Sequence, residues 1–322
     1  MRRIWLGLAS LLLVGWMAIV PAPADDYPAR PIQLIIPYPP GGSDVLSRRF
    51  AQAFSESMGQ QFLVVNRPGA STMLASEMVA AAKPDGYTLY VAAPHELAAN
   101  VSLFKTVGYN ALTDLTPISV MAFIPYFLLA NPSFPPHTPQ ELVAYLKAHP
   151  GQVAIGTFGV GSQTDLDARL IEASAGVQLS RIPYTGGAPA LTALMGNEVQ
   201  LGITTLLPSY SMVKGGMLRP IAIMADQRFS EFPDVPTLKE CGIDVSDGAR
   251  LALVGPKGLP RPIVDRLHAE VLKALARPDL QDYFRSQAVV PVGNTPEEFA
   301  ASLAADTRRW ADVIARMGIP KQ

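Results

Sequence analysis

Cysteine is almost absent from this chain, and neither sign of charge is in excess. The only cysteine, Cys241, has no partner for an internal disulfide, and we interpret it as a semi-buried thiol. The 26 basic and 27 acidic residues give a formal net charge of −1, so no basic surface favours nucleic acid as a partner. The 322 residues are 49% hydrophobic and 16% charged, which is typical of a globular protein long enough for two lobes.

Signatures of catalysis and metal binding are also missing. The sequence contains neither a G-x-S-x-G nucleophile motif nor an H-E-x-x-H zinc motif. The four histidines, His95, His137, His149 and His268, lack the spacing of metal ligands. We therefore expect no catalytic residue, no metal and no cofactor, and we predict that the protein is not an enzyme.

The N-terminus has the parts of a secretory signal peptide. Arg2 and Arg3 precede an apolar run over residues 4–20, and an Ala-x-Ala sequence ends at Ala24. We predict cleavage after Ala24 and export of the mature chain. An uncleaved membrane anchor is the alternative, because the apolar run is slightly long for a signal peptide.

The mature chain alternates strands, loops and helices, which is typical of parallel α/β folds. The apolar pattern predicts strands over 32–38, 62–65, within 83–93, and over 153–157, 179–183, 199–206, 218–224 and 251–254. It predicts helices over 44–58, 72–82, 138–149, 164–175, 188–195, 263–276 and 279–286, and a last helix from residue 295. We interpret the long apolar stretch 117–130 as strands that cross to a second lobe, and 251–254 as a returning strand.

These elements predict two α/β lobes with mostly parallel sheets, joined by crossing strands and separated by a cleft. The first lobe would hold residues 25–125 and 250–322, and the second lobe residues 126–249. Ligands of open α/β sheets bind beyond the carboxyl ends of strands. The site should therefore consist of loops that follow strands in both lobes.

Four such loops are candidates for a binding site. Three are rich in glycine and precede a helix: PPGGS (39–43), GTFGVGSQTD (156–165) and PYTGGAPA (183–190). Backbone N–H groups and the positive end of a helix favour an anion there, although each loop could be a plain turn. The fourth loop, AAPHEL (92–97), offers His95 as a donor, but a lone histidine more often packs or caps. The second loop lacks the patterns of nucleotide sites, so the loops together favour a small anion held by neutral donors.

The order and spacing of eight short segments give the chain a resemblance to a known family. The segments are YPARPIQLIIPYPPGGS, VVNRPGA, KPDGYTL, TPQELVAYLKAHPGQ, PYTGGAPALTALMGNEVQL, LRPIAIM, FPDVPTLKECG and NTPEEFAASLAADTRRWADVI. Over nearly the whole mature chain they resemble the Bug-type substrate-binding proteins, the extracytoplasmic receptors of tripartite tricarboxylate transporters. The resemblance implies a two-lobed periplasmic binding protein fold. It also implies a protein that closes on a small ligand, often a carboxylate, and delivers it to membrane transporter subunits.

The resemblance and the loop analysis together give the candidate ligand-binding residues. They are Tyr38, Pro40, Gly41, Gly42, Ser43, His95, Phe158, Gly159, Ser162, Gln163, Thr164, Asp165, Tyr184, Thr185, Gly186, Thr204, Thr205 and Arg250. The chain departs from the family pattern after Ser43, where one residue is missing. It also has Val160 where the family has Asn, Asp165 where it has His, and Arg250 where it has an aromatic residue. Arg250 would either pair with a second carboxylate in the cleft or form a surface or interlobe salt bridge.

The leading interpretation is a periplasmic receptor that binds a small organic anion, a carboxylate by resemblance, and delivers it to a tripartite tricarboxylate-type transporter. A ligand sensor for a membrane signalling protein is one alternative, and a secreted α/β hydrolase is another. We expect a monomer that binds a small organic acid and no nucleic acid.

Overall fold

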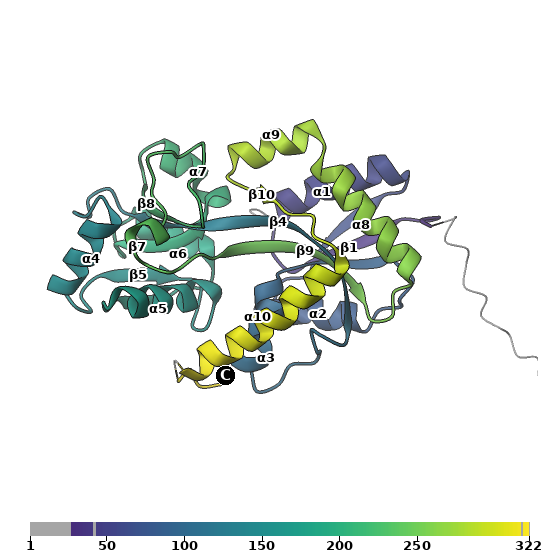
Figure 1. The fold of residues 1–322 in the computed structure, drawn as a ribbon, viewed down its shortest axis with the longest axis horizontal. Helices are drawn as coiled ribbons and strands as arrows, with labels where there is room; N and C mark the ends of the chain where they lie inside the picture. Colours follow the sequence, from purple (N-terminus) through teal and green to yellow (C-terminus); the bar gives the residue numbers. More distant parts are fainter. Residues whose placement is uncertain (1–26, 41–42, 317, 322) are drawn as a thin grey trace, which may run out of the picture.

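The computed structural model describes residues 27–40, 43–316 and 318–321, so the predicted signal peptide, residues 1–24, lies outside the described residues. Two α/β bodies lie along the long axis of the molecule and are joined by two long strands (Figure 1). We call the body on the right of Figure 1 the first lobe and the body on the left the second lobe. None of the described helices is long and apolar enough to cross a membrane.

The sheet of the first lobe has the order β2-β1-β3-β9-β4. Its strands are β1 (Ile32–Ile36), β2 (Phe62–Asn66), β3 (Thr88–Ala92), β9 (Gly248–Pro256) and β4 (Leu115–Ala130). β1 pairs in parallel with β2 and β3, whereas β9 runs antiparallel to β3 and β4. A short strand, β10 (Val290–Pro291), also pairs antiparallel with β4. The parallel strands are nearly continuous apolar runs because helices cover both of their faces.

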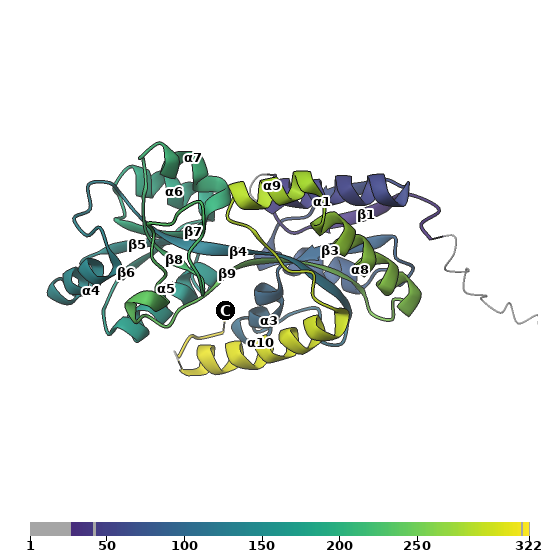
Figure 2. The ribbon, with the colours of Figure 1, turned by 45° about the horizontal axis from the view of Figure 1, so that its top comes forward.

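Helices cover the first-lobe sheet on both faces (Figure 2). On one face lie α1 (Ser43–Met58), α8 (Arg261–Leu275) and α9 (Pro278–Ser286), and on the other lie α2 (Met73–Ala80), α3 (Pro94–Leu103) and α10 (Pro296–Arg316). Phe50 of α1 contacts the ring of Phe284 of α9 at a centroid distance of 6.0 Å. Across the sheet, Trp310 of α10 is buried in a core with Tyr90 of β3. The two cores fix the orientation of the strand ends that lead into the site.

The second lobe repeats this layered arrangement. Its strands, β7 (Leu201–Thr205), β5 (Ala154–Thr157) and β6 (Ser180–Pro183), follow β4 in the sheet, and β8 (Arg219–Met224) also pairs with β4. β5 pairs in parallel with β6 and β7, while β7 and β8 run antiparallel to β4. Its helices are α4 (Pro139–Ala148), α5 (Gln163–Ala175), α6 (Gly187–Met195) and α7 (Leu206–Lys214).

β4 runs through both lobes and exchanges its partners part-way along. Residues 115–125 of β4 pair with β9, and residues 126–130 pair with β7 and β8. β9 begins at Gly248, opposite Pro125, and returns the chain to the first lobe. The predicted crossing strand and returning strand therefore both exist, and the first of them is one continuous strand of 16 residues.

Two helices were not predicted from the sequence. The segment 92–97 is not a loop, because Pro94 opens α3 at a first-turn position that suits proline. α3 is buried around most of its circumference and so has no amphipathic stripe to reveal it. α7 begins directly after β7 at Leu206, within the segment that we predicted as a strand. Helices therefore follow β3 and β7 with almost no intervening loop.

Candidate functional site

A cavity of about 820 Å³ lies between the two lobes. The first lobe lines it with segments that follow β1, β2 and β3, namely residues 37–40, 68–72 and 95–104. The second lobe lines it with residues 158–163, 185–195 and 204–212, which follow β5, β6 and β7. Three mutually parallel strands of each lobe thus direct their carboxyl ends at one cavity, which is where ligands of open α/β sheets bind.

Most of the residues proposed from the sequence line this cavity. They are Tyr38, Pro40, Ser43, His95, Phe158, Gly159, Ser162, Gln163, Thr185, Gly186, Thr204 and Thr205. Gly41 and Gly42 lie outside the described residues, between Pro40 and Ser43 of the lining. The loops that the sequence indicated do meet at one place, although they are spread over 168 positions of the chain from Tyr38 to Thr205.

Four proposed residues are not part of the cavity lining. Thr164 is fully buried, and its hydroxyl accepts a hydrogen bond from the backbone N–H of Phe158 at 2.8 Å. Asp165 accepts from the N–H of Gly161 at 3.0 Å and forms an ion pair with Arg169 at 3.2 Å. Both side chains stabilise the β5–α5 loop through these contacts and do not line the cavity.

Tyr184 and Arg250 also lie outside the cavity lining. Tyr184 is half-buried and packs against an apolar cluster of the second lobe. The guanidinium of Arg250 lies over the ring of Phe123, 5.2 Å from its centroid, and 3.9 Å from Asp247. Of the two roles considered for Arg250, the described contacts are those of a salt-bridge residue beside the crossing strands.

The β5–α5 loop owes its shape to two glycines. Gly159 has φ +122° and Gly161 has φ +74°, values that residues with a side chain rarely adopt. Ser162 then caps α5, because its hydroxyl accepts from the N–H of Asp165 at 3.3 Å. The N-terminal turn of α5 consequently points its positive end toward the cavity wall.

The segment after β2, which was not among the residues proposed from the sequence, also lines the cavity. Ala70, Ser71 and Thr72 have φ values of +47°, +50° and +70°, a run of left-handed residues without glycine. The carbonyl of Ser71 accepts from the side-chain amide of Asn100 on α3 at 2.7 Å. Such a strained segment is typical of functional sites. Its position directly after a strand was the signal that could have identified it.

Sequence analysis also missed Glu96, which lies beside His95 in the first turn of α3 and lines the cavity. Its carboxylate lies 3.6 Å from Nε2 of His95. Burial, and after it the Glu96 carboxylate, raises the pKa of the Tyr38 hydroxyl well above its usual value. None of the described residues that line the cavity is lysine or arginine.

A buried polar cluster lies behind Gln163, where the crossing strands meet the second lobe. The amide nitrogen of Gln163 donates to Asp167 at 3.0 Å and to Asp247 at 2.8 Å. Arg309 of α10 reaches the same Asp247 carboxylate at 3.3 Å. Burial and the neighbouring Asp247 raise the pKa of Asp167 well above its usual value. This cluster connects the cavity wall, the second lobe and the C-terminal helix.

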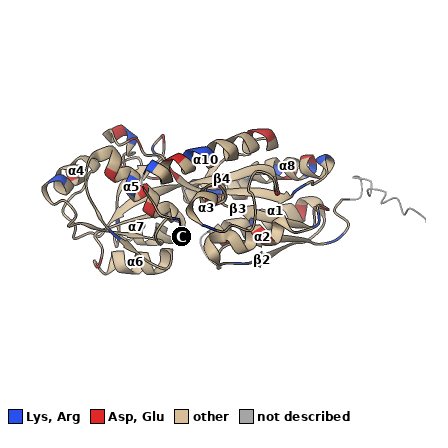
Figure 3. Ribbon diagram, turned by 90° about the horizontal axis from the view of Figure 1, so that it is seen from below, with Lys and Arg blue, Asp and Glu red and all other residues tan. Residues whose placement is uncertain are grey.

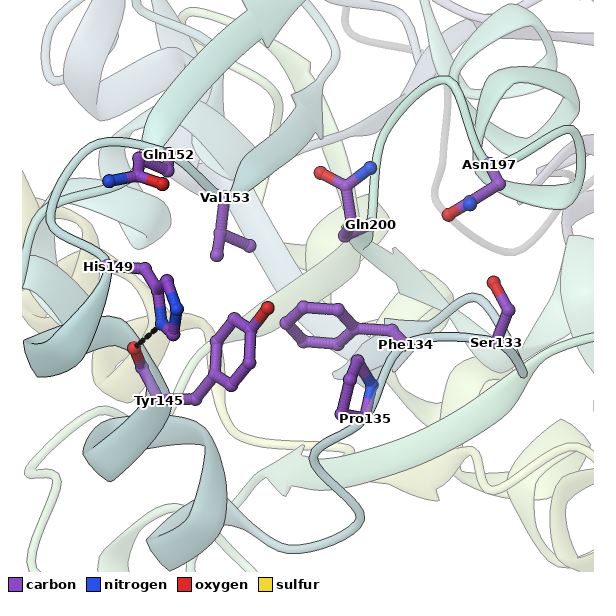
Figure 4. A pocket seen from close by; sticks show the side chains of 9 residues that line it. All are labelled: Ser133, Phe134, Pro135, Tyr145, His149, Gln152, Val153, Asn197 and Gln200. Carbon is purple, nitrogen blue, oxygen red and sulfur yellow. Dashed lines mark hydrogen bonds between the residues drawn. The ribbon is translucent and has the colours of Figure 1, made fainter.

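A second, smaller hollow of about 260 Å³ lies in the second lobe, away from the cleft (Figure 4). Tyr145 stacks on His149 at a centroid distance of 4.3 Å, and Phe134 meets the Tyr145 ring edge-on. One ring nitrogen of His149 bonds to the carbonyl of Tyr145. This hollow lies among one helix and its neighbouring loops and is smaller than the interlobe cavity. The interlobe cavity, which is lined by strand ends of both lobes, is therefore the better candidate for a ligand-binding site.

Metal chemistry has no support among the described residues. They contain no group of three or more His, Cys, Asp or Glu side chains that could hold a metal ion. Basic and acidic residues both occur along α8 and α10 (Figure 3).

A family profile described as "Tripartite tricarboxylate transporter family receptor" matches residues 46–319. The chain belongs to this receptor family. The protein BugT of Bordetella pertussis is 35% identical over 301 residues, which cover 92% of each chain. The family assignment agrees with the resemblance read from the eight sequence segments.

Three solved structures similar to this chain share its fold. The periplasmic binding protein BugD has a TM-score of 0.82 at 29% identity, covering 92% of this chain and all of its own. An R. palustris protein solved with adipate has a TM-score of 0.84 at 31% identity, covering 92% and 100% of the two chains. The protein MatC of Rhodopseudomonas palustris, solved with malate, has a TM-score of 0.79 at 29% identity, covering 89% and 100%. The predicted two-lobed periplasmic binding protein fold is confirmed.

Proposed function

We propose that this receptor binds a small carboxylate in the interlobe cavity and delivers it to a tripartite tricarboxylate-type membrane transporter. The observation that carries the proposal is the meeting of glycine-rich loops from both lobes at one cavity without a lysine or arginine among its described lining residues. A carboxylate held there would be bound by backbone N–H groups and hydroxyl groups. The similar proteins solved with adipate and malate support this ligand class.

The ligand contacts would come from both lobes. From the first lobe we propose Tyr38 and Ser43, with Gly41 and Gly42 between them, and from the second lobe Gly159, Ser162, Thr185, Thr204 and Thr205. Closure of the lobes would bury the ligand, and the membrane partner would recognise the closed shape. No bond of the ligand would be made or broken.

We infer that the mature protein begins after Ala24, acts in the periplasm as a monomer and binds no nucleic acid. We also propose the lobe boundaries near residues 125/126 and 249/250. The exchange of β4 partners between Pro125 and Tyr126 supports the first boundary, and the start of β9 at Gly248 supports the second.

The test is a thermal-shift screen of residues 25–322 against mono- and dicarboxylates and their amides. A ligand at about 100 times its Kd adds about 2.7 kcal/mol to the free energy of unfolding, which raises the melting temperature measurably. We expect a carboxylate to raise it and the matching amide to fail. Absence of a shift with every carboxylate, or an equal shift with the amides, would contradict the proposal.

A pair of glycine variants locates the site. Gly159→Val places a side chain at φ +122° in the cavity lining and should abolish the shift. Gly151→Val is the matched control, because Gly151 also has a positive φ, +71°, but lies outside the cavity lining. It should lower the melting temperature of the free protein without removing the ligand-induced shift. Retention of the shift in the Gly159 variant would exclude this loop from the site.

A further inference from the structure

Asp247 lies where the chain passes from the second lobe back to the first. It directly precedes β9, which begins at Gly248. Its backbone N–H donates to the carbonyl of Met224 of β8 at 3.1 Å, and its carbonyl accepts from the N–H of Tyr126 of β4 at 3.2 Å. Tyr126 is also the residue at which β4 begins to pair with β7 and β8. The backbone of Asp247 is therefore fixed to the second lobe, where both crossing strands enter it.

One oxygen of the Asp247 carboxylate accepts hydrogen bonds from both lobes. Gln163, the first residue of α5, donates to Oδ2 from the second lobe at 2.8 Å. Arg309 of α10 donates to the same oxygen from the first lobe at 3.3 Å. The side chain of Asp247 is 3% exposed, whereas that of Arg309 is 49% exposed. A buried carboxylate is costly unless it is paired, so both bonds stabilise this arrangement of the lobes.

The helix α10 also contacts the second lobe through apolar side chains. Leu166 of α5 is buried in the same apolar core as Trp310 and Val313 of α10. The C-terminal half of α10 extends from the first lobe toward α5 (Figure 2). The guanidinium of Arg309 lies over the ring of Trp310, 4.8 Å from its centroid. The first lobe therefore holds the second on this side through both an ion pair and apolar packing.

Gln163 connects this boundary between the lobes to the cavity. It is part of the cavity lining, and its amide nitrogen donates to Asp167 of the same helix at 3.0 Å as well as to Asp247. The two carboxyl groups use both hydrogens of the amide, which fixes its orientation. The cavity wall at the start of α5 and the Asp247 carboxylate consequently form one hydrogen-bonded unit.

We propose that Arg309 and Asp247 form an interlobe latch, which restrains rotation of the second lobe against the first, and that Gln163 connects this latch to the cavity. The inference rests on the proposed function, because it assumes that the lobes move when a ligand binds. Rotation about β4 and β9 carries Asp247 and Gln163 with the second lobe and leaves Arg309 with α10 in the first. The bond between Arg309 and Asp247 is therefore the one that rotation breaks. Arg309 does not line the cavity, so it acts on the position of the lobes and touches no ligand.

The test measures the distance between the lobes in the ligand-free protein. Spin labels are attached to Lys83→Cys in the first lobe and Glu198→Cys in the second, both at exposed positions, in a Cys241→Ser background. Double electron–electron resonance on residues 25–322 then gives the distribution of interlobe distances, with and without a substitution in the latch.

Three substitutions on α10 assign the restraint to the ion pair. Arg309→Gln should change the ratio of the distance populations by roughly three- to tenfold in favour of arrangements without the latch, as expected for a charged hydrogen bond with one half-exposed partner. Arg309→Lys should keep most of the unsubstituted distribution, because an ammonium group also donates to a carboxylate. Arg308→Gln is the matched control, because Arg308 is the adjacent exposed arginine of the same helix and its loss changes the net charge equally. It should leave the distribution unchanged.

The possible failures are distinguishable. A distribution in Arg309→Gln that matches the unsubstituted protein would overturn the latch and leave the carboxylate receptor standing. An equal change in Arg308→Gln would assign the effect to the charge of the helix and also overturn the latch. Failure of every carboxylate in the thermal-shift screen would contradict the proposed function but not the latch, because the distances are measured without a ligand.

Discussion

Asp167 should make the protein less stable as the pH rises, and Asp167→Asn should remove that loss. The side chain is fully buried in α5, shares the amide nitrogen of Gln163 with Asp247, and has one oxygen without a partner. Burial first, and then the neighbouring Asp247, raises its pKa well above the usual value. The folded protein therefore keeps a proton at Asp167 that the unfolded chain releases.

The magnitude follows from proton linkage. An unfolded aspartate has a pKa of about 3.9, so the contribution of Asp167 to stability is fully present only below that pH. Between about pH 5 and the raised pKa of the folded state, the folded protein binds one more proton than the unfolded chain. The free energy of unfolding then falls by about 1.4 kcal/mol per pH unit because of this group. Asparagine cannot ionise, so the variant should lack this slope and be the more stable protein at neutral pH.

Urea denaturation of both proteins at pH 5, 6 and 7 measures the difference in slope. Other titrating groups contribute to both profiles and cancel when the two are subtracted. Asp234→Asn provides the control, because Asp234 is an exposed aspartate of the second lobe. Its profile should run parallel to that of the unsubstituted protein.

Parallel profiles for the Asp167 variant and the unsubstituted protein, with the same difference in stability at pH 5 and at pH 7, would refute the reasoning. That result would mean that the buried carboxyl group is ionised, with its charge balanced by Arg309 and Arg250 through the shared cluster.

Three further predictions concern stability and are checked by urea denaturation. Trp310→Ala should lower the free energy of unfolding by about 3–5 kcal/mol, because the side chain is 1% exposed in the first-lobe core; a loss below 1 kcal/mol would contradict this. Gly248→Ala should cost about 1–3 kcal/mol, because its Cβ would lie 2.7 Å from the Cα of Pro125 on the paired strand; an unchanged stability would mean that the crossing strands yield easily. Ser162→Ala should cost about 1 kcal/mol through loss of the α5 cap, and the variant Ser162→Asp should retain the stability that alanine loses.

Local sequence rules predicted most of the helices and strands because those rules act over three or four residues. The last helix shows this: Thr295 and Glu298 form the predicted capping box, with each backbone N–H donating to the other side chain at 3.2 and 2.9 Å. The strand at residues 32–36 was identified from its apolar run between prolines. The same rules missed α3, because a helix that is buried on nearly every side has no apolar stripe.

The glycine-rich loops of the site were also predictable, because glycine marks the positions where the backbone takes conformations that other residues avoid. By itself, the sequence therefore determined most of the element types, the family and the loops that line the cavity. Only the tertiary structure decided which side chains face the cavity. Asp165 and Arg250 lie close to the cavity in sequence but are held by Arg169 and Asp247, respectively. Glu96 had no motif, and its place in the cavity lining became visible only when segments from both lobes were brought together. The cavity joins segments that are tens of positions apart in the chain, and no short-range spacing rule encodes which of their side chains face it.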